Sequence, residues 1–447
     1  MGNSKPCAVA KMVGCPVVEA MYRSAVGVDV HAELLVCSYQ SYDPQTSLAT
    51  TEAAEFGTTC SQLRQFAAWV RERNPQIVLM ESTGVLWRSP YEALEEVGFT
   101  SRELALVNAR DVKAATGRKT DHQDARRLAE YARFGKFKKS FVPPRIFRDM
   151  RNVSRLYIRQ RNNYAREKNR YQKLFNSIGC RARTVFSDIN GKSARKILDA
   201  FIDGDVNFLK TIDRCRGRLK ASAEEIFDAL NFSVSPAMLQ VLRVQRRTVE
   251  RCESECLATF EILRKMQEPY EAVVQLLMTI PCVKEISARL LLAEFTDDLS
   301  SFPTSEHFCS WLGICPGNNK SAGKAHGGST PKGNKWARAA LTEIAHGIGL
   351  SKGNPFREQF QVFKERRGTK RAIVAIAHKI ARLIYGMIKT GEPFHSTECG
   401  ALRNHRIRKV ARDLAQARKD SHIDITSSGI VDTATGAVLI PASCCLG

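Results

Sequence analysis

Acidic side chains in the N-terminal third of the chain stand where carboxylates could hold a divalent metal ion. Asp29 lies inside the apolar segment Val-Gly-Val-Asp-Val, where a charge is costly unless a partner compensates it. Glu81 closes a second apolar run, and Asp121 and Asp124 are three apart on a predicted helix, so they share one face. Carboxylate oxygens are ligands that Mg²⁺ prefers, so acids converging from two strands and a helix predict a Mg²⁺ site suited to nucleic-acid cleavage.

Each of these acids also has an explanation without a metal. Thr120 begins the spacing of a capping box, so the two acids that follow it would favour a helix N-terminus in any case. Glu81 precedes Ser-Thr-Gly, which fits a solvated turn. Asp29 is the hardest to explain without a partner ion. In so basic a chain, the four acids together favour the metal site.

The composition favours a polyanionic partner. Lys and Arg number 68 against 46 Asp and Glu, a formal net charge of +22 that points to nucleic acid. The 43% hydrophobic and 26% charged residues are typical of globular domains, and 447 residues predict two or three of them. The 14 cysteines form no repeated CxxC pairs, which argues against zinc and favours a reducing compartment. No apolar run is long enough to cross a membrane, so we expect a cytoplasmic protein.

Residues 23–140 are expected to form the catalytic domain, after a flexible lead-in over residues 1–22. Short apolar runs alternate with helical patterns, which predicts an α/β domain with a largely buried sheet. The expected strands are 26–38, 76–80 and 102–107, and the expected helices are 61–73, 88–97 and 121–134.

Residues 141–273 are expected to be helical and basic. Mainly apolar positions spaced alternately by three and four run from Met150 to Ile178, and a second such seam runs from Leu242 to Met266. We expect the two helices to pair as an antiparallel hairpin, within one chain or between chains, and to support an oligomer. Flanking arginines are expected to face nucleic acid, among them Arg155, Arg159 and Arg166.

Residues 274–394 predict a mainly helical domain, with helices near 285–295, 336–349 and 373–388. A glycine-rich basic loop, 315–334, lies between the first two of these helices. The tail, 395–447, changes from basic to polar and is expected to be disordered.

The glycine-rich loop contains Ser321, with Lys320 and Lys324 beside it. A serine hydroxyl is a weak nucleophile until a base or a metal activates it, and the two lysines would hold phosphate oxygens as point charges. A serine in such a loop is usually a turn residue, and Ser329 and Ser82 are chemically similar candidates.

These motifs, in this order, resemble the insertion-sequence transposases with a RuvC-like DEDD domain, the family described as bridge-RNA-guided recombinases. The similar segments are Gly-Val-Asp-Val-His at 27–31, Glu-Ser-Thr-Gly-Val-Leu-Trp at 81–87 and Gly-Arg-Lys-Thr-Asp-His-Gln-Asp-Ala at 117–125. The similarity resumes at Ile280 and continues through 312–316, 321–324 and 332–334. It covers roughly residues 25–394 in the family's domain order.

The resemblance implies an α/β RuvC-like (RNase H-like) domain, a coiled-coil insertion and a mainly α C-terminal transposase domain. It gives the four metal-ligand places to Asp29, Glu81, Asp121 and Asp124, which would bind Mg²⁺. Ser321 takes the place of the serine nucleophile, with a covalent phosphoserine intermediate. The expected nucleic-acid contacts outside the helical hairpin are Arg118, Lys119, Lys320, Lys324 and Lys332.

The resemblance also implies partners. These are donor and target DNA and a structured noncoding guide RNA that pairs with both, so the protein itself needs little base readout. A dimer that assembles to a tetramer is expected, in a bacterial or archaeal cytoplasm and associated with the nucleoid. One departure is that the family often has a Gly-x-Gly hairpin after Ile-Pro, whereas residues 282–285 here are Cys-Val-Lys-Glu. The DNA-gripping role of that hairpin is therefore not carried over.

Two other functions stay open from the residues alone. A metal-dependent junction-resolving endonuclease would use the same carboxylates with water as the nucleophile. A non-catalytic coiled-coil nucleic-acid-binding protein would leave Asp29 as buried structure. Metal-dependent DNA cleavage distinguishes the transposase and the endonuclease from the non-catalytic binding protein. A covalent protein–DNA adduct distinguishes the transposase from the endonuclease.

Overall fold

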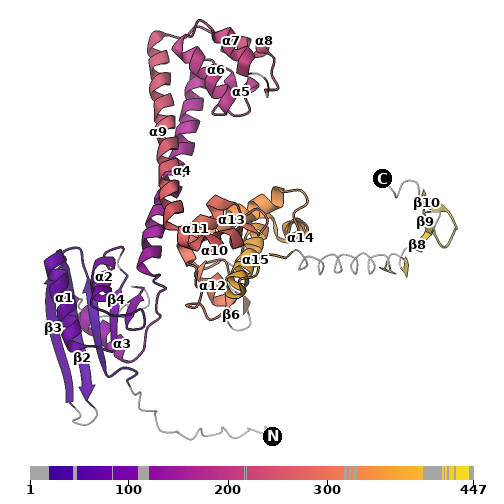
Figure 1. Cartoon of the computed structure of the whole chain (residues 1–447). Helices are drawn as coiled ribbons and strands as arrows, with labels where there is room; N and C mark the ends of the chain where they lie inside the picture. Colours follow the sequence, from indigo (N-terminus) through magenta and orange to yellow (C-terminus); the bar gives the residue numbers. More distant parts are fainter. Residues whose placement is uncertain are drawn as a thin grey trace, which may run out of the picture. The chain divides into compact units, whose positions relative to one another are not determined.

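The structure is a computed structural model of the 447-residue chain (Figure 1). It describes residues 20–43, 48–82, 84–108, 120–215, 217, 219–316, 320–321, 324–325, 330–395 and, with gaps at 417, 420–421 and 427–428, 415–441. The chain divides into two compact units, Met1–Arg145 and Ile146–Gly447, which are described separately.

The first unit is built on a mixed five-stranded sheet of order β3-β2-β1-β4-β5 (Figure 1). The first three strands are antiparallel neighbours, whereas β4 is parallel to β1 and β5 is parallel to β4. The strands are β1 Ser24–Val30, β2 Leu34–Asp43, β3 Leu48–Gly57, β4 Ile77–Glu81 and β5 Leu104–Val107. The expected strand region over 26–38 is therefore two strands with a tight turn between them, and β3 was not expected because Ala, Thr and Glu make up most of it.

Helices cover both faces of this sheet. Helices α1 (Cys60–Arg73) and α2 (Arg88–Glu96) pack against Val26 and Val28 of β1 on one face. Helix α3 (Asp121–Arg133) packs on the other face, where Leu128 lies among residues of β1, β4 and β5. Alternate residues of a strand point to opposite faces, so Ala25, Gly27 and Asp29 share the α3 face. The predicted α/β domain with a buried sheet is confirmed in outline.

The second unit begins with two long antiparallel helices, α4 (Arg145–Ser177) and α9 (Pro236–Met266) (Figure 1). Rings of Tyr157 and Phe260 lie 5.3 Å apart, the Tyr164 hydroxyl donates to Glu253 at 3.0 Å, and Gln245 donates to Glu167 at 2.8 Å. The two predicted seams thus contact each other within one chain. Pairing of these helices between chains stays a prediction.

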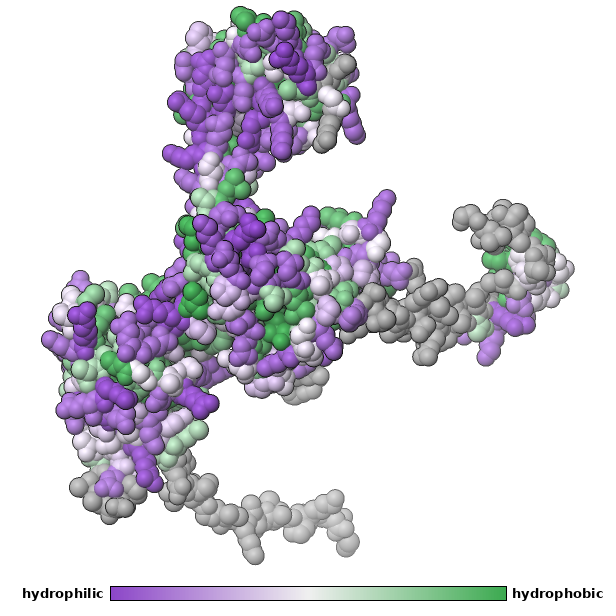
Figure 2. Space-filling view, viewed as in Figure 1, coloured by the Kyte–Doolittle hydropathy of each residue, from purple (hydrophilic) through white to green (hydrophobic). Residues whose placement is uncertain are grey.

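A small helical bundle joins the far ends of α4 and α9. It contains α5 Ala182–Val185, α6 Lys192–Asp203, α7 Phe208–Cys215 and α8 Ala223–Leu230. Ile197, Ile212 and Leu242 are buried in its core. Hydrophilic side chains cover most of the bundle's visible surface (Figure 2).

A mainly helical domain follows α9. Its elements are η2 Glu268–Tyr270, α10 Glu271–Met278, α11 Glu285–Phe295, α12 Ser305–Trp311, β6 Lys320–Ser321, β7 Lys324–Ala325, α13 Lys335–Leu350, α14 Arg357–Arg367 and α15 Thr369–Thr390. Phe308 packs at its centre between Phe295 and Phe302, with ring centroids 5.5 Å and 5.3 Å away. In the turn before α11, Cys282 has φ of 69°, a left-handed conformation that glycine adopts most easily. The turn after Ile280-Pro281 thus has a left-handed residue although Gly-x-Gly is missing.

Part of the tail differs from the sequence-based expectation of disorder. Three short segments form an antiparallel sheet: β8 Ile423–Thr426, β9 Gly429–Asp432 and β10 Val438–Pro441. Asp432 accepts from the backbone amide of Ala434 and the hydroxyl of Thr435, which fixes the β9–β10 turn. The polar composition of the tail as a whole gave no indication of these short apolar strands. No helix among the described residues is long and apolar enough to cross a membrane.

Candidate metal centre and serine loop

Asp29 and Glu81 lie side by side because β1 and β4 are parallel. The register pairs Val28 with Met80, so the two acids follow at the carboxyl ends of neighbouring strands. Asp29 is 7% exposed. Burial raises the pKa of its carboxyl; His31 opposes this shift, while Glu81 and Asp124 reinforce it. Several negative charges thus converge on a partly dehydrated position, as a bound cation would require.

The close approach of α3 to β1 brings in the other acids. Gly27 makes this approach possible, because a Cβ there would lie 2.2 Å from the carbonyl oxygen of Ala125 and 2.3 Å from the amide nitrogen of Ala129. Thr120 is the N-cap of α3 and accepts from the backbone amide of Gln123 at 3.4 Å. The N-terminus of α3 therefore has both the helix cap predicted from Thr120 and two of the converging acids, Asp121 and Asp124.

Gly27→Val is expected to disrupt this unit. Its side chain would collide with helix backbone, which cannot rotate away, so we expect a loss of at least about 2 kcal/mol in the free energy of unfolding. Thermal unfolding followed by circular dichroism measures it. Gly386→Ala is the control, because the added methyl group would meet no atom within 4 Å beyond its own turn of helix. An unchanged unfolding temperature for Gly27→Val would contradict the packing described for α3.

His31 joins the carboxylates and was not among the residues selected from the sequence. Its Nε2 lies 3.2 Å from Oδ2 of Asp29 and 3.6 Å from Oδ1 of Asp121. One ligand atom from each of these three residues falls within 4.8 Å of the others, which is close enough for a shared ion. The alternation of β1 placed His31 and Asp29 on one face and was the signal that could have found it.

Asp124 stands at the edge of the cluster. Its Oδ1 accepts from Arg127 at 2.6 Å, and it contributes to the raised pKa of Asp29. The structure thus brings the four predicted acids to one end of the sheet, on β1, β4 and the first turn of α3. Three or four carboxylates are a donor set that fits Mg²⁺, and the imidazole nitrogen also suits Mn²⁺.

The serine loop lies in the second unit. Ser321 is in β6 and pairs in register with Lys324 of β7. The stems of the loop meet where Gly313, at φ of 71°, packs on Gly333: a Cβ on Gly333 would lie 2.3 Å from the Gly313 nitrogen. The loop thus leaves the domain and returns to it at one narrow point.

A buried ionic cluster fixes the returning stem. Glu294 of α11 is 1% exposed and accepts two hydrogen bonds from Arg155 at 2.8 and 2.9 Å. It also accepts from the Asn334 side chain at 2.7 Å, while Asn334 caps α13 by accepting from the backbone amides of Trp336 and Ala337. The guanidinium of Arg155 therefore has a partner within the protein. This ion pair accounts for an arginine at position 155 without the expected contact with nucleic acid.

Glu294→Ala is expected to cost about 3–5 kcal/mol of the free energy of unfolding, because Arg151 and Arg155, whose side chains are 13% and 30% exposed, would both lose this carboxylate partner. Urea unfolding followed by tryptophan fluorescence measures it, since Trp336 lies 5.7 Å from the Arg155 guanidinium. Glu343→Ala is the matched control: Glu343 also pairs with an α4 arginine, Arg161, at 2.9 Å, but is 66% exposed. We expect the control to cost less than about 1 kcal/mol. Equal losses of unfolding free energy in the two variants would show that the buried cluster stabilises the fold no more than an exposed ion pair does.

The other predicted nucleic-acid contacts are placed as follows. Arg159, Arg166 and Lys332 are exposed. Arg159 lies 6.0 Å from the ring of Trp336, and Arg166 donates to Asn163 at 3.4 Å. Lys320 and Lys324 lie in β6 and β7, whereas Arg118 and Lys119 fall outside the described residues. Their contacts with nucleic acid stay predictions.

Comparison with known families decides what this arrangement belongs to. Residues 26–179 match the family model for the DEDD domain of IS110 elements, described as a transposase, and residues 274–361 match the model described as the transposase IS116/IS110/IS902 family. The chain carries both domains of an IS110-family transposase. The first match contains the acidic cluster and the second contains the serine loop. These matches confirm the transposase part of the family resemblance.

Individual relatives are more distant. A putative transposase, y4pF/y4sB, of Sinorhizobium fredii is 28% identical over 127 residues, which are 27% of this chain and 33% of the relative. The match thus spans about a third of that relative's length. Two structures of Thermus thermophilus RuvC, one in complex with a Holliday junction substrate, are 14% identical and cover 26% of this chain and 99% of their own, with TM-scores of 0.21 and 0.20. At these scores, the fold assignment rests on the strand order and the family matches.

Proposed function

We propose that this IS110-type transposase is an RNA-guided DNA recombinase that cuts and rejoins strands through a covalent phosphoserine intermediate with Mg²⁺. The convergence of Asp29, Glu81, Asp121 and Asp124 at one end of the sheet supports this proposal most directly. The two transposase matches and the net charge of +22 supply the substrate class, which is DNA.

The carboxylates would act as the metal-holding part of the site. Bound Mg²⁺ supplies charge that favours ionisation of an attacking oxygen and stabilises the leaving oxygen in an in-line displacement. Burial and the acidic neighbours raise the pKa of Asp29, so a bound cation would favour its ionised form. His31 orients Asp29 from one side and Glu81 flanks it on the next strand.

Ser321 would act as the nucleophile. Its hydroxyl oxygen forms a bond to the scissile phosphorus and gives up its proton, while the bond from phosphorus to the sugar oxygen breaks and that oxygen takes up a proton to become a hydroxyl. Attack by a second DNA hydroxyl on the phosphoserine reverses these changes and joins new strands without an external energy source. The reaction requires the loop to meet a carboxylate cluster of the same or another chain, which fits the expected dimer and tetramer.

The endonuclease alternative has one observation in its favour. The carboxylate cluster is complete within Met1–Arg145, without the serine loop, and would serve equally well with water as the nucleophile. A covalent protein–DNA adduct on denaturing gels separates the two functions. Sequencing of RNA that copurifies with the protein tests the guide: a discrete structured RNA encoded beside the gene supports it, and recovery of bulk cellular RNA contradicts it.

A further inference from the structure

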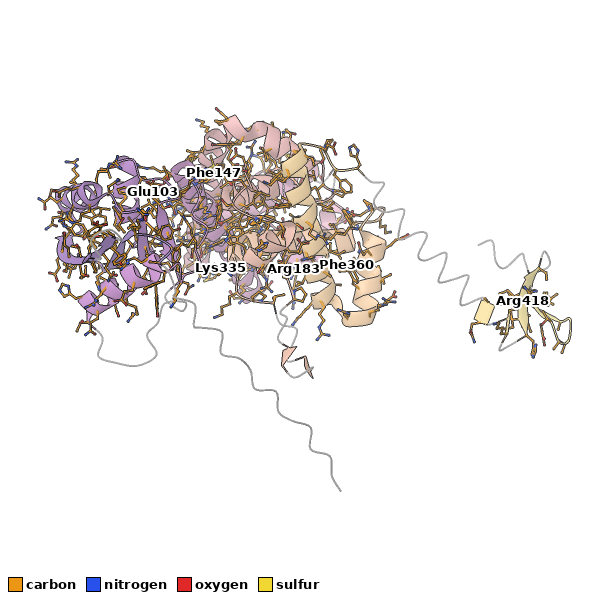
Figure 3. All side chains as sticks on the ribbon, turned by 90° about the horizontal axis from the view of Figure 1, so that it is seen from below. Glu103, Phe147, Arg183, Lys335, Phe360 and Arg418 are labelled. Carbon is orange, nitrogen blue, oxygen red and sulfur yellow. The ribbon has the colours of Figure 1, made fainter. Side chains whose placement is uncertain are left out.

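A wide groove lies between α14, α15 and the stems of the serine loop. Its volume is about 1790 Å³, larger than the roughly 300–1,000 Å³ of small-ligand pockets, so a polymer suits it better than a metabolite. Pro316 and Thr330, the described residues that precede β6 and follow β7 in the serine loop, both line it. The ring of Phe360, labelled in Figure 3, supports α14: a Cβ on Gly349 of α13 would lie 2.6 Å from that ring.

The groove is strongly basic. Its cations come from the end of α14 and along α15, and Glu392 is the acid that lines it within the described residues. Among the described residues, these cations form one ion pair, between Arg382 and the exposed Glu306 at 3.6 Å. Burial lowers the pKa of His378, and Arg382 lowers it further, so this histidine faces a positive environment. The lining cations are Arg366, Arg367, Lys370, Arg371, Lys379 and Arg382.

Aromatic rings lie among these charges. Phe363, Tyr385 and Phe394 line the same groove. The Tyr385 hydroxyl donates to the carbonyl oxygens of Phe302 and Pro303 at 2.8 and 3.1 Å, which holds its ring in place. Cations that follow a backbone, together with aromatic faces on which bases stack, are the combination that binds single-stranded nucleic acid. A duplex would hide its base faces from these rings.

We propose that the α14–α15 groove holds a single DNA strand and delivers it to the loop that carries Ser321. The choice of DNA rests on the proposed function, because strand exchange needs an unpaired DNA strand beside the nucleophile. None of the groove's cations or aromatic residues was selected from the sequence, where the cations of 366–382 are an ordinary pattern on predicted helices.

Fluorescence anisotropy of a labelled 20-nucleotide single strand with the full chain in EDTA tests the groove without cleavage. Arg367→Gln/Arg371→Gln is expected to weaken binding about tenfold and to lower the slope of log K against log salt by about 1.4, as two lost phosphate contacts would. Lys210→Gln/Lys220→Gln removes the same charge from exposed positions in the α5–α8 bundle and should change neither value by half as much. Equal effects of the two pairs would overturn the proposal.

Phe363→Leu tests stacking, because it keeps an apolar side chain and removes the ring. We expect at least about a fivefold loss for the single strand and none for blunt duplex of the same sequence. Tighter binding of duplex, or of RNA of the same sequence, would overturn the assignment to a single DNA strand. Ser321→Ala should bind like the wild type. If binding depends on the groove residues but no serine adduct forms, the serine chemistry is rejected and the groove proposal stands. If the adduct forms equally well in the groove variants, only the groove proposal is rejected.

Discussion

Asp29→Asn is expected to reduce DNA strand cleavage by on the order of a thousandfold or more while leaving DNA binding nearly unchanged. The substitution keeps the side chain's shape but removes a charge at the centre of the acidic cluster, and metal assistance amounts to several kcal/mol of barrier, at about 1.4 kcal/mol per tenfold in rate. Nicking of a labelled substrate in Mg²⁺ measures cleavage, and calorimetric titration with Mn²⁺ measures loss of the metal. Glu81→Gln, Asp121→Asn and Asp124→Asn should follow the same pattern.

The same variant should unfold at a higher temperature than the wild type in EDTA at neutral pH. The pKa of Asp29 is raised in the folded state, chiefly by burial, so the ionised carboxylate opposes folding. Its contribution is favourable below the unfolded pKa and is lost as pH rises through the folded value, so the advantage of Asn should vanish in acid. Glu130→Gln is the control on the same helix, since Glu130 belongs to an exposed pair with Arg126. A less stable, fully active Asp29→Asn variant would mean that Asp29 serves structure instead of metal.

Strand and helix periodicity predicted the elements that hold the acids but could not show how closely they approach. The apolar runs before Asp29 and Glu81 place both acids at strand ends, and parallel pairing of β1 and β4 follows from an α/β pattern. The contact of α3 with β1 depends on a missing side chain at Gly27, which in sequence is one glycine among 28. The spacing of two residues between Asp29 and His31 places them on one face of the strand, but a lone histidine after a strand was not weighed as a partner of the acids.

The cluster around Glu294 shows a different limit of prediction from sequence. Glu294 follows an apolar helix segment and looks like an ordinary end-of-helix acid, while Arg155 belongs to a run of basic residues expected to face nucleic acid. Their sequence separation of 139 residues leaves no local pattern. In the structure, Arg155 pairs with Glu294, whose side chain is 2% exposed, because a side chain's partner depends on tertiary packing; the contact of Arg155 with nucleic acid stays a prediction.

Ser321→Ala should abolish both the covalent adduct and recombination, and this is the result that separates serine chemistry from hydrolysis. A nucleophile's oxygen has no substitute in alanine, so we expect a loss on the order of 10⁴-fold or more, comparable to removal of other enzyme nucleophiles. Denaturing gels should show DNA of defined length bound to wild-type protein, and peptide mass spectrometry should place the phosphodiester on Ser321. Ser329→Ala and Ser82→Ala, the chemically similar serines, should keep the adduct.

The Ser321→Ala chain is expected to retain Mn²⁺ binding and DNA binding, because the carboxylate cluster and the loop stems do not depend on one hydroxyl. Loss of metal binding would point to misfolding, and unfolding curves that match the wild type exclude that explanation. Nicking with free ends at the wild-type rate by Ser321→Ala would show that water attacks the phosphate, and the chain would then be a metal-dependent endonuclease on a transposase scaffold. A covalent adduct found on Ser329 would instead support the covalent mechanism and identify Ser329 as the nucleophile.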